Sequence, residues 1–245
     1  MAALTPEDLV ARVLYRDGLM LAIDKPAGLP VHAGPGGGDN LEELFDALRF
    51  GLPRPPALAH RLDRDTSGCL VLGRHRKALR RLGRLFSEGL VEKTYWAVTD
   101  GAPAGDSGTI DAALKKITRK GAGWRMVVAA DGQAAVTDWR VLGRAGGRGW
   151  LELRPRTGRT HQIRVHLALL GCPVAGDEAY GRGDGALLLH ARAIALPLYP
   201  ARPPVAVAAP LPDHMRTALA PFGFVEQDRP APPQPEENRH DSRAL

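Results

Sequence analysis

The chain has 245 residues, with 33 lysines and arginines against 27 aspartates and glutamates, so its formal net charge is +6. A hydrophobic share of 44% and a charged share of 24% are typical of globular proteins and exclude a fibrous or wholly disordered chain. No run approaches the roughly 20 apolar residues of a membrane helix, and two cysteines, Cys69 and Cys172, exclude a disulfide scaffold. Because the N-terminus also lacks a signal-peptide pattern, we expect a cytoplasmic protein without a membrane span.

Residues 226–245 differ from the rest of the chain in composition. They are polar and Pro-rich and hold five acidic residues and three arginines, which predicts a disordered tail. The remaining 1–225 carries 30 basic and 22 acidic residues, a net of +8, and is expected to form one domain. Lysine supplies only six of the 33 basic residues, and the forked guanidinium of arginine matches phosphate, which favours a polyanionic partner. A GC-rich genome would also enrich arginine over lysine, but it would not produce an excess of basic over acidic residues.

Apolar periodicity and turn residues predict short strands that alternate with helices. Before residue 90 the predicted elements are a strand pair about the turn Arg16–Gly18, a helix over 41–50 capped by Asp39-Asn40, a strand over 69–72 and a helix over 75–88 ended by Gly89. After it come a strand over 90–101, further short strands and turns over 106–141, and a strand over 149–157. A helix from an N-cap at Thr160 to Gly171, a strand over 186–189 and a short helix over 212–223 follow. This order predicts an α+β fold with one mixed, mainly antiparallel sheet and flanking helices.

The segment HRLDRDTSG at 60–68 concentrates polar groups immediately before an apolar strand. Catalytic groups are often carried by loops that a rigid strand holds in place. If a guanidinium reached Asp63, that carboxylate would stay ionised. The alternative is a solvated turn in which Asp65 to Gly68 make local backbone hydrogen bonds, and composition alone favours this turn.

A second polar segment, RPRTGRTHQIRVH at 154–166, is rich in arginine and precedes the apolar run LALLG. Arginines at a helix N-terminus are electrostatically unfavourable unless an anion lies nearby, which favours a functional role for them. His161 and His166 are five residues apart, so they do not match the zinc-binding spacing of four. We therefore expect no metal site here.

These two segments, together with DGLMLAIDKPAGLPVH (17–32), KTYWAVTDG (93–101) and LLLHA (187–191), resemble motifs of the RluA-type RNA pseudouridine synthases. The likeness of the second segment extends through CPVAGDEAYG to residue 181. Five motifs thus follow in the order of the family between residues 12 and 196. The resemblance implies the pseudouridine synthase fold, a single catalytic domain with a central RNA-binding cleft, in a member without the N-terminal RNA-binding module of some relatives.

The resemblance implies that specific uridines in tRNA or rRNA are flipped out and isomerised to pseudouridine, without a metal or other cofactor. By position in the motifs, Asp63 is the essential aspartate, Arg164 is the arginine that pairs with it, and Tyr95 packs its ring on the target uracil. The Tyr95 hydroxyl would also help the proton leave the base carbon at the end of the cycle, so these three residues are the expected catalytic residues. Whether Asp63 acts as nucleophile or as base stays open. Without the motif, Tyr95 would be interpreted as an ordinary half-buried strand aromatic.

The resemblance also implies a set of substrate-binding residues. Arg61 matches an arginine that enters the RNA stack where the target base has left it. Ile163 and Leu189 would form apolar walls of the uracil pocket, although core packing explains these two equally well. His60 and Thr66, in the same motif as Asp63, complete the set.

Extruding a base costs a few kcal/mol, which a positive protein surface would help to offset. The surface we expect to contact the RNA backbone comprises Arg76, Lys77, Arg80, Arg81 and Arg84 of one helix, and Lys115, Lys116, Arg119 and Lys120. The expected partner is structured RNA, a tRNA or rRNA stem-loop, bound by a monomer. Two alternative functions remain: a base N-glycosylase, which would release free uracil, and a non-catalytic RNA-binding protein.

Overall fold

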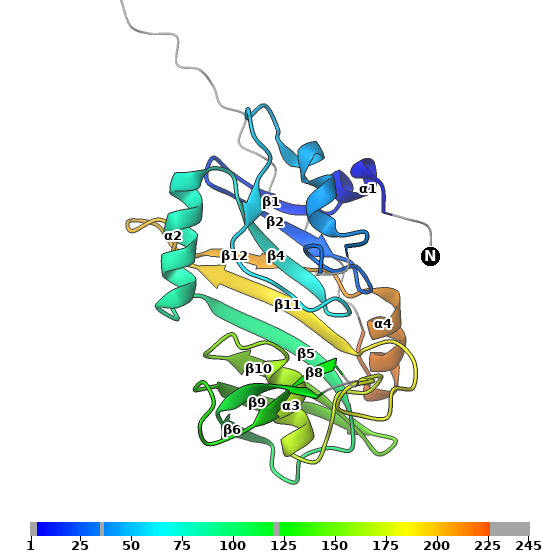
Figure 1. Cartoon of the computed structure of the whole chain (residues 1–245). Coiled ribbons are helices and arrows are strands. Elements are labelled where there is room, and N and C mark those ends of the chain that lie inside the picture. Colours follow the sequence, from blue (N-terminus) through cyan, green and yellow to red (C-terminus); the bar gives the residue numbers. More distant parts are fainter. Residues whose placement is uncertain (1–3, 35–36, 120–122, 226–245) are drawn as a thin grey trace, which may run out of the picture.

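The computed structural model describes residues 4–34, 37–119 and 123–225. Its centre is a ten-stranded sheet in the order β1-β2-β4-β11-β5-β10-β9-β6, with β12 paired to β11 and β3 paired to β4 (Figure 1). The strands of this sheet are β1 (Val13–Arg16), β2 (Met20–Lys25), β3 (Ala57–Leu58), β4 (Ser67–Gly73), β5 (Glu92–Asp100), β6 (Ser107–Asp111), β9 (Val136–Ala145), β10 (Arg148–Pro155), β11 (Leu189–Leu196) and β12 (Val205–Ala208). A separate two-stranded hairpin consists of β7 (Leu114–Arg119) and β8 (Gly123–Val128).

Short helices connect and cover the strands. They are α1 (Pro6–Ala11), the 3-10 helix η1 (Leu41–Leu48), α2 (Arg76–Ser87), α3 (Gln162–Leu169), α4 (Asp213–Leu219) and the 3-10 helix η2 (Ala220–Phe222). Within the described part of the chain, none of them has the length and apolar character needed to cross a membrane.

Alternating side chains divide the core between the two faces of the sheet. On one face, α1 and η1 pack over β2 and β4 through Leu9 and Phe45, and α3 packs over β5 and β10 through Leu167. On the other face, α2 packs through Leu82 and α4 through Met215 (Figure 1). The period of two along each strand produces this division, because successive strand residues point to opposite faces.

The predicted α+β fold with a mixed, mainly antiparallel sheet is confirmed. β4 pairs with β11 in parallel, with Ser67 opposite His190, and the other pairs among the named strands are antiparallel. This parallel pairing places the chain just before β4 beside the chain just before β11. The polar segment at 60–68 therefore lies next to the segment that ends in LLLHA.

Two element boundaries were predicted wrongly. The helix expected over 41–50 is a 3-10 helix, and it ends two residues early because Phe50 adopts a left-handed φ of 43°. The strand expected over 186–189 begins only at Leu189. The backbone of Leu188 bonds instead to a neighbouring loop and to β5.

Other local predictions are confirmed. The Asn40 side chain accepts the N–H of Glu42, as expected of an N-cap. α2 ends at Ser87 with Glu88 as its C-cap, and the next residue is Gly89, whose φ of 70° suits glycine. The tail predicted over 226–245 lies outside the described residues.

Candidate active site

Two distant segments bring three charged side chains together. Arg164 of α3 donates from Nε and Nη2 to the carboxylate of Asp177, at 2.8 and 2.7 Å, and from Nη1 to Oδ2 of Asp63, at 3.4 Å. The side chain of Asp177 is fully buried, that of Arg164 is 10% exposed and that of Asp63 is 25% exposed. Asp63 is therefore the carboxylate of this cluster that faces solvent.

The contacts keep the buried pair charged. Burial opposes the charge of Arg164, but the hydrogen bonds and attraction of Asp177 outweigh it and raise the pKa of Arg164. For Asp177, burial alone would raise the pKa of the carboxyl group. Hydrogen bonds from Arg164 and from the N–H groups of Ala179 and Tyr180 instead lower this pKa below its usual value. Since two guanidinium nitrogens are committed to Asp177, the third offers its positive charge to Asp63.

Lys25 holds the loop that carries Asp63. Its ammonium is fully buried and donates to the carbonyl oxygens of Pro26, Arg64 and Thr66, at 2.7, 2.8 and 3.0 Å. The N–H of Thr66 in turn donates to the carbonyl of Asp63 at 3.2 Å. Burial lowers the pKa of Lys25 to about 7. This role was not predicted, because a lysine at a strand end carries no local sign of a partner further along the chain.

Gly68 marks the point where this loop enters β4. Its φ is 107°, and a Cβ at this position would lie 2.3 Å from the carbonyl oxygen of Ala191 in β11. Beside it, the hydroxyl of Ser67 is hydrogen-bonded to Nδ1 of His190 at 2.9 Å. Only glycine permits this approach of the two parallel strands.

An uncommon backbone conformation starts α3. The N-cap is His161, with a φ of 54°, and not Thr160 as predicted. The side chain of Gln162 closes the preceding turn by accepting from the N–H of Arg159 at 3.0 Å and from Oγ1 of Thr157 at 2.7 Å. These bonds replace an ordinary threonine cap. A left-handed conformation costs a non-glycine residue about 1–2 kcal/mol, and such strain is concentrated at functional sites.

His161 and Tyr180 border the charged cluster. Nε2 of His161 lies 3.9 Å from Oδ2 of Asp63, and Nδ1 is hydrogen-bonded to the Tyr180 hydroxyl at 2.9 Å. Burial lowers the pKa of His161 more than the charge of Asp63 raises it, so the ring is neutral at pH 7. The Tyr180 hydroxyl also accepts the N–H of Met126 at 3.1 Å, which ties β8 to the cluster.

The sequence analysis did not predict Asp177 or Tyr180 as site residues. Both lie in the loop between α3 and β11. The available signal was the place of this loop, CPVAGDEAYG, at the end of the second matched motif.

Tyr95 stands on β5 where two hydrophobic clusters meet. Its ring packs against the cluster beneath η1 and against the cluster beneath α3, which contains Ile163 and Leu189. Ile163 is 6% exposed and Leu189 is 3% exposed, whereas Tyr95 is half-buried. Burial, and secondarily the charge of Asp63, raises the pKa of Tyr95, which keeps its hydroxyl protonated. The structure thus brings Tyr95, Ile163 and Leu189 together beside the Asp63 loop.

The other three residues predicted to bind substrate differ in their surroundings. Arg61 is exposed, as expected of a residue that contacts a large ligand. Thr66 is 3% exposed. Nε2 of His60 accepts the N–H of Val71 at 3.0 Å, its ring stacks on Phe86 at 4.7 Å between centroids, and burial lowers its pKa to about 4. These contacts show that His60 and Thr66 support the loop, and their contact with substrate stays a prediction.

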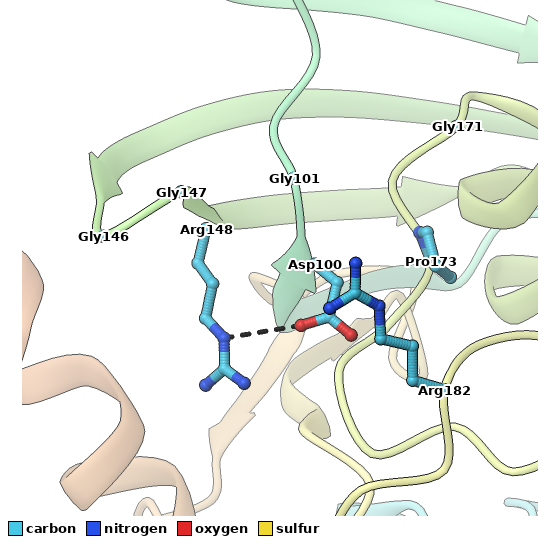
Figure 2. Close-up of a pocket in the computed structure, with 8 residues that line it drawn as sticks. All are labelled: Asp100, Gly101, Gly146, Gly147, Arg148, Gly171, Pro173 and Arg182. Atoms are coloured by element: carbon cyan, nitrogen blue, oxygen red, sulfur yellow. Dashed lines mark ion pairs between the residues drawn. The ribbon is translucent and has the colours of Figure 1, made fainter.

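The pocket in Figure 2 is a separate feature. It has a volume of about 590 Å³ and is lined by Asp100, Gly101, Gly146, Gly147, Arg148, Gly171, Pro173 and Arg182. Nε of Arg148 lies 3.4 Å from the carboxylate of Asp100, and the Arg182 side chain lines the same pocket (Figure 2). Asp100 follows Tyr95 by five residues, which is about 17 Å along a strand. None of the predicted site residues lines this pocket.

The charged cluster is built from the segments that carry the sequence resemblance. Within the described ranges, no three His, Cys, Asp or Glu side chains are grouped as ligands for a metal ion. Residues 20–169, which include Asp63, Tyr95 and Arg164, match the family model described as RNA pseudouridylate synthase. The chain belongs to this family. It is an RNA pseudouridine synthase, an isomerase that acts on RNA, so the function predicted from the motifs is confirmed.

Individual relatives match the synthase over most of its length. An uncharacterized RNA pseudouridine synthase of Zymomonas mobilis is 45% identical over 209 residues, covering 83% of this chain and 95% of the relative. The ribosomal large subunit pseudouridine synthase D of Xanthomonas campestris is 37% identical and covers 88% of this chain and 70% of its own. Among solved structures, the human RNA pseudouridylate synthase domain containing 4 matches with a TM-score of 0.76 and 28% identity, over 91% of this chain and 97% of that one. The predicted fold family is confirmed.

Proposed function

We propose that the synthase isomerises a uridine in a stem-loop of tRNA or rRNA, with Asp63 as its catalytic aspartate. The observation that carries the proposal is the position of Asp63. It is the solvent-facing carboxylate of the cluster, 3.4 Å from an arginine that is anchored from behind by Asp177. One relative is named as a ribosomal large subunit synthase, which makes rRNA the first RNA to test.

The chemistry requires an ionised carboxylate at the sugar. Isomerisation breaks the bond between C1′ and N1 of uridine, turns the base, joins C1′ to C5 and releases the C5 proton. Asp63 either attacks C1′ or removes a proton from the sugar, and both roles need its charged form. The third nitrogen of Arg164 donates to the Asp63 carboxylate, and Asp177 holds the guanidinium in place.

Tyr95 is proposed to pack its ring on the flipped-out uracil, with Ile163 and Leu189 as apolar neighbours. Its position where the clusters beneath η1 and α3 meet supports this role. Because its pKa is raised, the hydroxyl stays protonated. The ring then acts as a platform, and the hydroxyl acts as a hydrogen-bond donor in preference to a base.

The β7–β8 hairpin is proposed to contact the RNA beside the target base. Trp124 is 45% exposed, and its ring lies 5.1 Å from that of His161, which neighbours Asp63. Lys116 Nζ lies 4.6 Å above the Trp124 ring, and the Arg125 guanidinium lies 4.8 Å from the Tyr180 ring. An exposed aromatic ring among cations suits stacked bases and phosphates.

Further basic residues extend the proposed surface. Arg61 is proposed to enter the stack that the target base leaves, and exposed α2 residues to contact the backbone, namely Arg76, Lys77, Arg80 and Arg84. Lys120, expected from the sequence to join them, lies outside the described residues. We also propose that the synthase works in the cytoplasm as a monomer, which cell fractionation and sedimentation would test.

The experiment compares pseudouridine positions in total tRNA and rRNA from cells with and without the gene, by carbodiimide-dependent stops of reverse transcription. We expect one or more stops to vanish on deletion and to return with the wild-type gene but not with Asp63→Asn. Recovery of the stop with Asp63→Asn would refute the role of Asp63. Abasic sites and free uracil in place of pseudouridine would instead support a glycosylase.

A further inference from the structure

Lys93 on β5 is a half-buried cation. Its ammonium makes one hydrogen bond, to the carbonyl oxygen of Thr157 at 2.8 Å. Across the described ranges, no carboxylate lies within 4.0 Å of it. Burying an ammonium without a counter-charge is costly, so such a group is a candidate for ligand binding.

Lys25 and Lys93 both lie near the Asp63 loop, but their ammonium groups differ in the number of hydrogen-bond partners. Lys25 uses its ammonium on three backbone carbonyls, which accounts for all three donors. Lys93 uses one donor and keeps two. The positive charge of Lys93 also acts on the imidazole of His60. Burial lowers the pKa of His60, and the charge of Lys93 lowers it further, so this ring is neutral. Burial likewise lowers the pKa of Lys93 to about 8, which reflects the same lack of an anion.

The position of Lys93 indicates which anion would reach it. Lys93 lies two residues before Tyr95 on β5, and residues two apart on a strand point to the same face, about 7 Å apart. Nζ of Lys93 lies 3.8 Å from the Cβ position of Gly158, in the turn before α3. In a nucleotide whose base packs on Tyr95, the glycosidic bond joins that base to its sugar, and the sugar carries the phosphate. We infer that the backbone of such a nucleotide comes within reach of the Lys93 side chain.

We propose that Lys93 binds a backbone phosphate next to the target uridine. The inference rests on the proposed function only in taking Tyr95 as the platform for the uracil. The phosphate supplies the missing counter-charge, and the bond to Thr157 holds the ammonium in place to receive it. Lys93 then anchors the backbone of the flipped nucleotide while Asp63 acts on its sugar.

The test measures affinity for a synthetic RNA stem-loop with a single uridine in its loop, in an Asp63→Asn background that prevents turnover. Lys93→Met is expected to weaken binding about 10-fold and to lower the slope of log affinity against log salt by about one. Lys93→Arg, which keeps the charge, is expected to restore most of the affinity and the slope. An unchanged slope in Lys93→Met would overturn the proposal, because a merely structural lysine does not alter counterion release.

A second measurement changes the RNA and leaves Lys93 in place. A neutral methylphosphonate is placed at each phosphate flanking the uridine in turn. At one position the methylphosphonate is expected to weaken RNA binding by the Asp63→Asn protein about 10-fold. At that position it is expected to cause no further loss of binding in the protein that also carries Lys93→Met. Equal losses for both proteins at every position would contradict the proposal even if Lys93→Met folded poorly. Failure of the unchanged synthase to form pseudouridine would count against the proposed function alone, since these measurements follow binding.

Discussion

Arg164 and Asp177 form an ion pair through two guanidinium nitrogens, at 2.8 and 2.7 Å, with a carboxylate that is fully buried. The pair spans 13 residues, from the start of α3 to the loop that follows it. Because a planar guanidinium held at two nitrogens has one orientation, Asp177 decides where the third nitrogen points. Asp177 is therefore a positioning residue for the contact between Arg164 and Asp63.

The role of Asp177 predicts a loss of both stability and activity in Asp177→Asn. Removing one partner of a buried ion pair costs about 3–5 kcal/mol of unfolding free energy. Misplacement of Arg164 is expected to lower pseudouridine formation about 10²-fold. Denaturant unfolding and a rate assay on the same preparation measure the two effects.

A surface pair supplies the matched control. Asp138 accepts two bonds from Arg156, at 2.7 and 2.8 Å, but the two side chains are 32% and 64% exposed. Asp138→Asn should cost less than about 1 kcal/mol and leave the rate unchanged. If Asp177→Asn behaved like this control, the buried pair would not orient Arg164.

The approach of β4 to β11 predicts that Gly68→Ala destabilises the protein. The new Cβ would lie 2.3 Å from a backbone oxygen and would occupy a φ of 107°. We expect a loss of at least about 2 kcal/mol, together with reduced activity because the Asp63 loop must move. Gly18→Ala is the control, since no atom lies within 4 Å of its Cβ position. Equal melting temperatures for the two variants would show that the strand contact tolerates a methyl group.

His190 predicts part of the acid sensitivity of the fold. It is fully buried, and burial lowers its pKa to about 4 from an ordinary value of 6.5. Between these two pH values the unfolded chain binds a proton that the folded protein does not, so stability falls as pH falls. As pH falls through this range, the histidine lowers the free energy of unfolding by about 3 kcal/mol in total. Above pH 6.5 this destabilisation is absent.

His190→Asn tests this linkage through the pH dependence of unfolding. The amide keeps a polar atom near Ser67 and cannot titrate. The variant is expected to lose less unfolding free energy than the parent between about pH 7 and about pH 4. The same pH dependence in both proteins would mean that other groups account for the acid sensitivity.

The candidate site residues that the sequence indicated are those whose chemistry and motif lie in one short segment. Asp63, Tyr95 and Arg164 each belong to a contiguous motif, and the structure brings them together. Asp177 and Lys25 were missed because their roles arise from contacts with residues 13 and up to 41 positions away. A lone aspartate in a loop or a lone lysine at a strand end carries no local pattern that identifies such a partner.

The fold shows the same division between local and distant causes. Periodicity predicted α2 and its stop at Gly89, because an amphipathic helix is written into its own residues. The insertion of β11 between β4 and β5 was not predictable, since strand order depends on packing across the whole sheet. Thr160 failed as a cap for a related reason: the side chain of Gln162 closes the turn first.

The central claim is that Asp63 drives isomerisation of uridine in RNA, and tritium at C5 of uridine tests it most directly. Transcripts of rRNA and tRNA genes labelled with 5-tritiated uridine are incubated with purified protein, and tritiated water and free uracil are measured. The unchanged synthase is predicted to release tritium without free uracil, and Asp63→Asn to release none while still binding the RNA. Release by Asp63→Asn at the parent rate, or free uracil in place of tritiated water, would contradict the account.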